Sequence, residues 1–148
     1  MKHLDELLEQ DKFEKGIRRI LEIINKENGQ VNQLMTVQFV SCSEIERTIT
    51  LEFPVMEWQL NSNRVMHGGI VSTAFDIAMG VFANYLNRAV TGNITVNFIK
   101  PVPVNDSLII TSKVTSSGKR LTTLSAEGRL KSSGIIAGTA VATFANIS

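Results

Sequence analysis

Cysteine, histidine and proline are scarce in this sequence. Its 148 residues include one cysteine, Cys42, two histidines and three prolines. A single cysteine cannot close a disulfide within the chain or build a cysteine-based zinc cluster. The two histidines, His3 and His67, lie far apart, which argues against a two-histidine metal site. The sequence therefore predicts no metal and no other cofactor, and Cys42 is interpreted as structural.

An excess of charge of one sign is also missing. The formal net charge is +1, and Lys and Arg are dispersed along the chain. This distribution argues against a nucleic-acid surface. Neither GxxxxGK[ST] nor GxGxxG occurs, so ATP and NAD are not indicated. The 43% hydrophobic and 20% charged residues are typical of a folded domain, and we expect one domain over residues 1–148.

No segment reads clearly as a leader or a membrane span. The first six residues, MKHLDE, are acidic where a signal peptide is basic and then apolar. The most apolar stretch, Ile70 to Leu86, contains Asp76 and looks too short for an easy membrane span. We therefore expect a cytoplasmic protein without a membrane partner.

A helical extension is predicted over residues 1–30. Its apolar residues recur at steps of three and four, with charges between them, as in an amphipathic helix. A break is expected near Gly16, and Asn28-Gly29 is expected to end the helix. The apolar positions are Leu4, Leu7, Leu8, Phe13, Ile17, Ile20, Leu21 and Ile24.

Six strands and a second helix follow. Alternating apolar residues predict strands around Met35–Phe39 and Thr48–Phe53. Residues 70–87 are apolar around most of a helical circumference, which predicts a buried helix. Short turns separate the last strands, so the sheet should be antiparallel. These strands are predicted at Ile94–Lys100, Ser107–Val114, Leu121–Leu130 and Ile135–Phe144. The pattern predicts an α+β fold in which a curved sheet wraps one long helix.

Asp76 is the strongest candidate for a chemical role. It is the only charged residue between Ile70 and Asn87, and burying an unpaired carboxylate is costly. It also belongs to a small, polar stripe with helical spacing. That stripe could equally meet solvent or the backbone of a partner. Its members are Gly69, Thr73, Asp76, Gly80 and Asn84.

His67-Gly68-Gly69 lies immediately before this helix. The free N–H groups at a helix start carry partial positive charge and suit a developing oxyanion. His67 could act as a base or as an orienting donor, or it could simply cap the loop. Asn61 could orient water or polarise a carbonyl, or it could be an ordinary turn asparagine. By itself the HGG motif is also compatible with a plain turn from loop to helix.

Two adjacent cations, Lys119 and Arg120, follow Gly118 in a predicted turn between strands. They could meet the phosphates of a nucleotide-containing substrate. The alternative is that both are ordinary solvated charges.

The combined spacing of these motifs resembles the phenylacetate-pathway and hydroxybenzoyl-CoA branch of the hotdog thioesterases. The resemblance rests on Asn61, on His67-Gly68-Gly69, on Asp76 nine residues after His67, and on Thr95–Pro101. Gly118-Lys119 falls where that family has a turn with a glycine and a basic residue. The similarity covers residues 33–144 and leaves the N-terminal helix outside.

The resemblance implies a hotdog fold and an enzyme that hydrolyses acyl-CoA to a carboxylic acid and CoA. It implies a homodimer joined sheet edge to sheet edge, often paired into a tetramer, with each active site between subunits. Asp76 would come from one chain as general base or nucleophile. Asn61, His67 and the amides of Gly68 and Gly69 would come from the other.

Other positions are matched by the same resemblance. Thr91 is the best match for a hydroxyl that helps hold the water. Asn63-Arg64 occupies a place where the family often has glycine, which bears on the shape of the loop. Phe75 and Met79 are expected to line the acyl pocket, and Lys119 and Arg120 to meet the CoA phosphates.

Two other functions remain open on the sequence. A non-catalytic acyl-CoA-binding or sensing module would tolerate loss of the carboxylate, so the presence of Asp76 argues against it. A hotdog hydratase usually presents its Asp and His in another arrangement.

Overall fold

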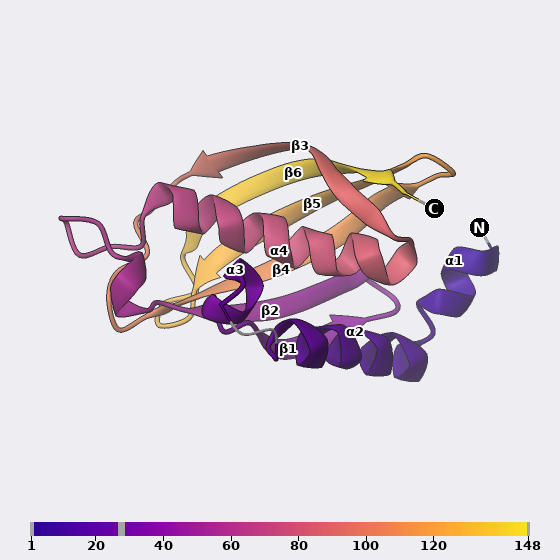
Figure 1. Ribbon diagram of the computed structural model, residues 1–148, viewed down its shortest axis with the longest axis horizontal. Helices are drawn as coiled ribbons and strands as arrows, with labels where there is room; N and C mark the ends of the chain where they lie inside the picture. The colour runs from indigo at the N-terminus through magenta and orange to yellow at the C-terminus, as the bar shows by residue number, and fades with distance from the viewer. Residues whose placement is uncertain (1, 27–28, 148) are drawn as a thin grey trace.

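The computed structural model describes residues 2–26 and 29–147 (Figure 1). Helical segments come first, then two strands, the long helix and four further strands. The predicted α+β arrangement is confirmed. The elements are α1 (Lys2–Leu7), α2 (Gln10–Ile24), α3 (Val31–Leu34), β1 (Gln38–Ser43), β2 (Thr48–Pro54), the 3-10 turn η1 (Glu57–Gln59), α4 (Gly68–Leu86), β3 (Ala89–Phe98), β4 (Ser107–Ser117), β5 (Leu121–Leu130) and β6 (Ile136–Asn146).

The six strands form one antiparallel sheet in the order β1-β2-β4-β5-β6-β3. Figure 1 shows the sheet curving around α4, with α2 beside α4 at the β1 end. β3 follows α4 directly and pairs with β6, so it forms one edge of the sheet. The start of β3 therefore runs beside α4, a position that matters for the site.

Helix α4 forms the centre of the core. On length and composition its 19 residues could cross a membrane, so the expectation that this stretch is too short for a span is wrong. In this fold 56% of its most apolar window is buried, and the sheet and α2 provide the cover. The side chains of Phe75, Met79 and Phe82 are fully buried.

The N-terminal helix breaks at a different place from the one predicted. The Glu9 side chain accepts hydrogen bonds from the N–H groups of Asp11 and Lys12 and caps α2, so the break precedes Gln10. Gly16 lies inside α2, where a Cβ atom would collide with the Tyr85 ring of α4. The glycine is required for this close helix crossing and does not interrupt the helix.

Aromatic contacts fix α2 against α4. The Phe13 ring lies 5.4 Å from the Phe82 ring and 5.5 Å from the Tyr85 ring. The Tyr85 hydroxyl donates a hydrogen bond to the Leu7 carbonyl. Burial raises the pKa of Tyr85, which keeps the hydroxyl protonated as a donor.

The ends of α2 and β1 also differ from expectation. Helix α2 ends at Ile24, and Asn28 of the predicted stop signal lies outside the described residues. Met35 caps the short α3, and the chain then turns through Thr36, whose φ is 51°. The alternation that starts at Met35 therefore comes from a helix exit followed by a strand. β1 begins at Gln38, later than predicted.

The third strand, in contrast, begins earlier than predicted. β3 starts at Ala89, before the expected Ile94. The sequence pattern did not show its first residues because a bulge between Thr91 and Asn93 interrupts the period-two alternation. The bulge contains Gly92, whose added Cβ would lie 3.2 Å from the Thr143 carbonyl oxygen. The other predicted strands agree with the structure to within a few residues.

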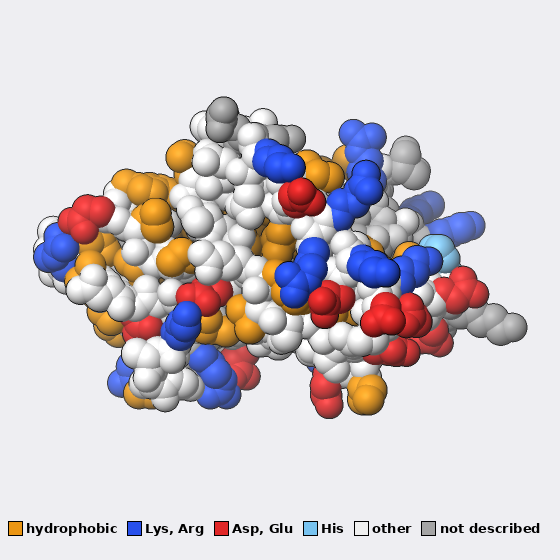
Figure 2. Space-filling model, turned by 90° about the horizontal axis from the view of Figure 1, so that it is seen from below, with side chains coloured by type: hydrophobic (Ala, Val, Ile, Leu, Met, Phe, Trp, Pro, Cys, Tyr) orange, Lys and Arg blue, Asp and Glu red, His pale blue; other side chains and the backbone are white. Residues whose placement is uncertain are grey.

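Charged side chains of both signs are interspersed on the face that carries the outer side of α2 (Figure 2). Pairs along this helix include Arg18 with Glu14 and Lys26 with Glu22, both exposed. Such exposed ion pairs contribute little to stability, and they mark this side of α2 as its solvent-facing side.

Candidate active site

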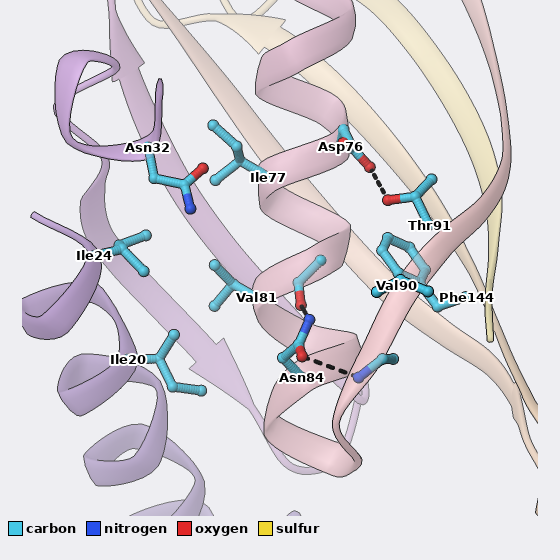
Figure 3. Close-up of a pocket in the computed structure, with 12 residues that line it drawn as sticks. Ile20, Ile24, Asn32, Asp76, Ile77, Val81, Asn84, Val90, Thr91 and Phe144 are labelled. Carbon is cyan, nitrogen blue, oxygen red and sulfur yellow. Dashed lines mark hydrogen bonds between the residues drawn. The ribbon is translucent and has the colours of Figure 1, made fainter. Parts of the chain in front are cut away.

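Asp76 lies in the third turn of α4, on the face that the sheet does not cover. Its side chain is partly exposed, and its Oδ1 accepts a hydrogen bond of 2.7 Å from the Thr91 hydroxyl. Thr91 lies at the bulge of β3, so the strand start and the helix centre meet here (Figure 3). The match of Thr91 to a site hydroxyl thus agrees with the geometry. The bond orients the carboxylate, and Asp76 Oδ2 has no hydrogen bond from the described residues.

The other polar side chains of the stripe, Thr73 and Asn84, form hydrogen bonds with backbone carbonyls of α4 itself. The Thr73 hydroxyl donates to the Gly69 carbonyl at 2.8 Å, and the Asn84 amide donates to the Gly80 carbonyl at 2.9 Å. Asn84 also accepts from the Ala89 N–H at 3.0 Å, which ties the end of α4 to β3. Asp76 is therefore the member of the stripe that is left available for chemistry.

His67 is the N-cap of α4. Its Nδ1 accepts a 3.0 Å hydrogen bond from the Gly69 N–H, so the neutral ring carries its proton on Nε2. The His67 N–H donates to the Gln59 carbonyl at 2.8 Å. With Nδ1 engaged, His67 presents its Nε2 at the surface, where it can donate a hydrogen bond. Of the roles considered, the orienting one fits this geometry.

The two glycines of the motif have different surroundings. The Gly69 N–H is taken by His67, whereas the Gly68 N–H meets no acceptor among the described residues. Gly68 is the first residue of α4, where the helix dipole is positive. The Phe98 ring, at the end of β3, lies beside it. Gly68 is thus the better of the two candidates for an oxyanion donor.

Asn61 organises the loop before α4. Its Oδ1 accepts from the N–H groups of Asn63 at 2.9 Å and Val65 at 3.4 Å. This is the turn role that the sequence left open, and only the side-chain NH₂ remains for a substrate. Arg64 holds a left-handed φ of 58° and pairs with Glu57 at 3.0 Å. A position where the family often has glycine therefore keeps its backbone shape with arginine.

Within one chain, Asp76 and Gly68 cannot act on the same carbonyl group. Asp76 comes eight positions after Gly68 on the helix, which is about 12 Å along the axis at 1.5 Å per residue. A base and an oxyanion donor must both lie within hydrogen-bond reach of the reacting group. Within one chain, the two groups therefore lie too far apart to contact one thioester carbonyl.

Lys119 and Arg120 lie in the turn between β4 and β5, near the C-terminal end of α4. The Asn146 side chain donates to the carbonyls of Gly118 at 3.1 Å and Lys119 at 2.9 Å, which fixes the turn. Both cationic side chains are exposed. A cavity of about 440 Å³ is lined by Lys119 and by Leu86, the last residue of α4. The turn is therefore at the opposite end of α4 from Gly68.

Phe75 and Met79, which the resemblance assigns to the acyl pocket, do not line the cleft beside Asp76 in a single chain. Both side chains are fully buried in the core. The Phe75 ring fills the space above Gly128 and Gly138, where an added Cβ would lie 2.9 Å and 3.2 Å from it. The sequence showed an apolar helix, but it did not show which side the sheet would cover.

The pocket beside Asp76 has a different wall. A cleft of about 390 Å³ lies between α2, α4 and the start of β3 (Figure 3). Ile20 and Ile24 of α2 face it, together with Ile77 and Val81 of α4. In the sequence the two α2 residues are apolar positions of an amphipathic helix, and no local signal marks them as pocket residues. Within 2–26 and 29–147, no three His, Cys, Asp or Glu side chains are grouped as metal ligands.

The chain belongs to the thioesterase superfamily, whose family model matches residues 63–137. This stretch holds His67, Gly68, Asp76 and Thr91, together with the Lys119-Arg120 turn, and leaves Asn61 just outside. The matched segment therefore includes most of the residues that the sequence marks as site candidates.

Similar proteins support the same grouping. A Caenorhabditis elegans protein with an esterase name is 29% identical over 119 residues, which is 77% of this chain and 70% of that protein. The structure of PaaI from the phenylacetic acid degradation operon of E. coli superposes with a TM-score of 0.77 at 19% identity, covering 90% of this chain and 95% of that one. A Streptococcus mutans protein bound to acetyl CoA gives a TM-score of 0.69 at 19% identity, covering 76% and 89%. These structures confirm the predicted hotdog fold.

Proposed function

We propose that the protein is an acyl-CoA thioesterase whose active site forms between two copies of the chain. One observation carries the proposal. Thr91, which holds Asp76, is near the start of β3, and Phe98, which lies beside Gly68, is at its end. The two halves of the chemistry therefore border opposite ends of one edge strand.

Edge strand β3 suits pairing with a second copy. Among the described residues it is paired on one side only, by β6, and it is ten residues long. Val90 and Phe98 on this strand are exposed apolar residues. Open edges of this length are normally covered in proteins. An antiparallel β3–β3 pair around a two-fold axis would extend the sheet across both copies.

This pairing solves the separation problem within one chain. When two copies of a strand pair antiparallel, the start of each lies opposite the end of the other. Thr91 of one copy would then lie near Phe98 of the second, which brings the Asp76 carboxylate toward Gly68 of that copy. Both groups could reach a single thioester.

The chemistry follows from these groups. The Gly68 N–H, and the Nε2–H of His67 beside it, would donate to the thioester oxygen as negative charge develops there. One such donor is worth roughly 3–4 kcal/mol in comparable sites. Asp76 would take a proton from water as the water attacks the carbonyl carbon, or attack directly to form an acyl-enzyme anhydride. In the first route the C–S bond breaks and the proton held by Asp76 passes to the sulfur, so CoA leaves as the thiol. In the second route CoA leaves as the thiolate and takes a proton from solvent, and water then hydrolyses the anhydride to the free acid and restores the Asp76 carboxylate.

The phenylacetate and hydroxybenzoyl-CoA branch is the part of the superfamily that we propose for this chain. The Asn61, His67-Gly68-Gly69 and Asp76 spacing supports it, as does the fold similarity to PaaI. The likeness to a protein bound to acetyl CoA supports a CoA thioester as substrate. The Lys119-Arg120 turn would meet its phosphates from the copy that supplies Asp76, because that turn lies beyond Asp76 toward the end of α4.

The test is release of free CoA thiol from acyl-CoAs ranging from acetyl to long-chain and aryl. The wild type should turn over at least one medium-chain or aryl substrate. A folded wild type that binds acyl-CoA but releases no thiol from any of them would identify a binding module instead. A hydratase would change the absorbance of an enoyl-CoA without releasing thiol.

A mixing experiment tests the shared site. Asp76→Ala and Asn61→Ala chains should each be weakly active, and co-refolding them should restore up to a quarter of wild-type activity per chain, because half of the dimers are mixed and one of their two sites is intact. No recovery from a mixture shown to contain heterodimers would rule out a site built from two chains.

A further inference from the structure

We infer that the N-terminal extension is a specificity element: helix α2 forms the wall of the acyl-binding cleft and selects apolar, uncharged acyl groups of medium size. This inference rests on the proposed thioesterase function, because it places the acyl group beside Asp76. Helix α2 lies outside the residues matched by the superfamily model. Selectivity would thus be supplied by a segment separate from the groups proposed for the chemistry.

The position of the cleft supports this role. Figure 3 shows Ile20 and Ile24 of α2 on one side and Asp76 and Thr91 on the other, with α4 between them. An acyl group whose thioester is held at Asp76 can therefore extend over α4 until it meets α2. The contacts of Phe13 with Phe82 and Tyr85 fix α2, so the wall is part of the packed structure.

The size of the cleft limits the acyl group. Its volume is about 390 Å³, and a water-sized group occupies about 30 Å³, so roughly a dozen non-hydrogen atoms fit. This matches an acyl chain of about eight to ten carbons or a substituted aryl group, with the thioester included. A long fatty acyl chain would exceed the space between Asp76 and α2.

Gly80 contributes to that space. It lies one turn after Asp76 on the floor of the cleft. A Cβ atom there would meet only the Phe144 ring, at 3.5 Å, which is ordinary contact, so packing among the described residues does not demand glycine. Glycine is unfavourable in the middle of a helix, and an open cleft floor explains its presence.

The charge of the lining excludes one class of substrate. Among the described residues that line the cleft, Asp76 is the only charged one, and none is a Lys or Arg. Burying an acyl group that ends in a carboxylate would require a positive partner. Dicarboxylic acyl-CoAs should therefore be poor substrates.

The experiment compares three substitutions on α2. Ile24→Phe fills the cleft, Ile24→Ala enlarges it, and Ile23→Phe is the matched control, since Ile23 is 51% exposed and does not line the cleft. The quantity measured is the ratio of kcat/KM for octanoyl-CoA to kcat/KM for acetyl-CoA. One methylene in an apolar pocket changes kcat/KM by about 10-fold or more, so Ile24→Phe should lower the ratio at least tenfold. Ile24→Ala should shift the preferred chain to greater length, and Ile23→Phe should leave the ratio within twofold of wild type.

A general loss of stability would lower both rates together and leave the ratio unchanged, so the ratio separates selectivity from folding. If Ile24→Phe does not fold, Ile20→Phe fills the same cleft and carries the same expectation. An unchanged ratio in a folded, active Ile24→Phe or Ile20→Phe protein overturns the inference.

Binding distinguishes failure of this inference from failure of the proposed function. The probes are S-octyl-CoA and S-ethyl-CoA, thioethers that cannot be hydrolysed, with affinities measured by calorimetry. If the wild type hydrolyses nothing, the thioesterase proposal fails. The inference still stands if Ile24→Phe weakens S-octyl-CoA at least tenfold more than S-ethyl-CoA, and equal weakening overturns it.

Discussion

The two faces of helix α4 share one sequence segment but have opposite properties. On the side toward the sheet, Phe75, Met79 and Phe82 are fully buried. On the other side, Asp76, Gly80 and Asn84 are small or polar and border a cleft. The first face forms the core and stabilises the fold, whereas the small and polar residues of the second contribute little to the free energy of unfolding. Substitutions should therefore separate stability from activity along a single helix.

Asp76→Asn should have the largest effect on activity. The amide keeps the size and can still accept from Thr91, but it lacks the negative charge that a base or nucleophile needs. Loss of general-base catalysis should lower kcat by about 10²–10⁴-fold, and loss of a nucleophile by more. The melting temperature should stay the same or rise, because active-site groups are often held at a cost in stability. Near wild-type kcat in stopped or continuous thiol assays would falsify the proposed mechanism at its centre.

Phe75→Ala should have the converse signature. Removing a buried aromatic ring should lower the free energy of unfolding by about 3–5 kcal/mol in urea titrations. The matched change on the outer face, Thr73→Ala, should alter it by only about 0.5 kcal/mol. Equal destabilisation by the two substitutions would contradict the division between the faces.

Gly68→Pro tests a single backbone atom at the start of the helix. Proline is well tolerated at the first position of a helix, and the ψ of 139° at His67 suits a residue before proline. The substitution removes the N–H and should lower kcat by about 10²–10³-fold. Gly68→Ala is the control, since it keeps the N–H and its Cβ would approach the Phe98 ring no closer than 3.8 Å. Similar activity in both variants would assign the oxyanion contact to another donor.

The smallest effect is expected for the turn at the far end of α4. Replacing Lys119 and Arg120 with alanine should raise KM by about two- to fivefold per charge, because exposed ion pairs contribute up to about 1 kcal/mol each. The value of kcat should hardly change, since this contact is the same in ground and transition states. Lys113→Ala, at an exposed position of β4, is the charge control. An unchanged KM would leave both residues as solvated turn charges.

The sequence by itself determined the order of elements and the polarity of α4. Period-two alternation located β2 and β5, because a half-covered strand has apolar residues at every second position. Turn signals bounded β4 and β6. The 3.6-residue period separated Asp76 from its apolar neighbours in the same way. Errors occurred where backbone geometry interrupts these periods, at Thr36 and at the β3 bulge.

Only the tertiary structure decided which residues share a site. In the folded chain the Thr91 hydroxyl donates to Asp76, and the Gly69 N–H donates to His67. The Gly68 N–H has no acceptor among the described residues. The fold also buried Phe75 and Met79 in the core and placed Ile20 and Ile24 beside the cleft at Asp76. The physical reason is that periodicity describes one element at a time. Which face the sheet covers, and which helix closes the other side, depends on contacts between segments distant in sequence.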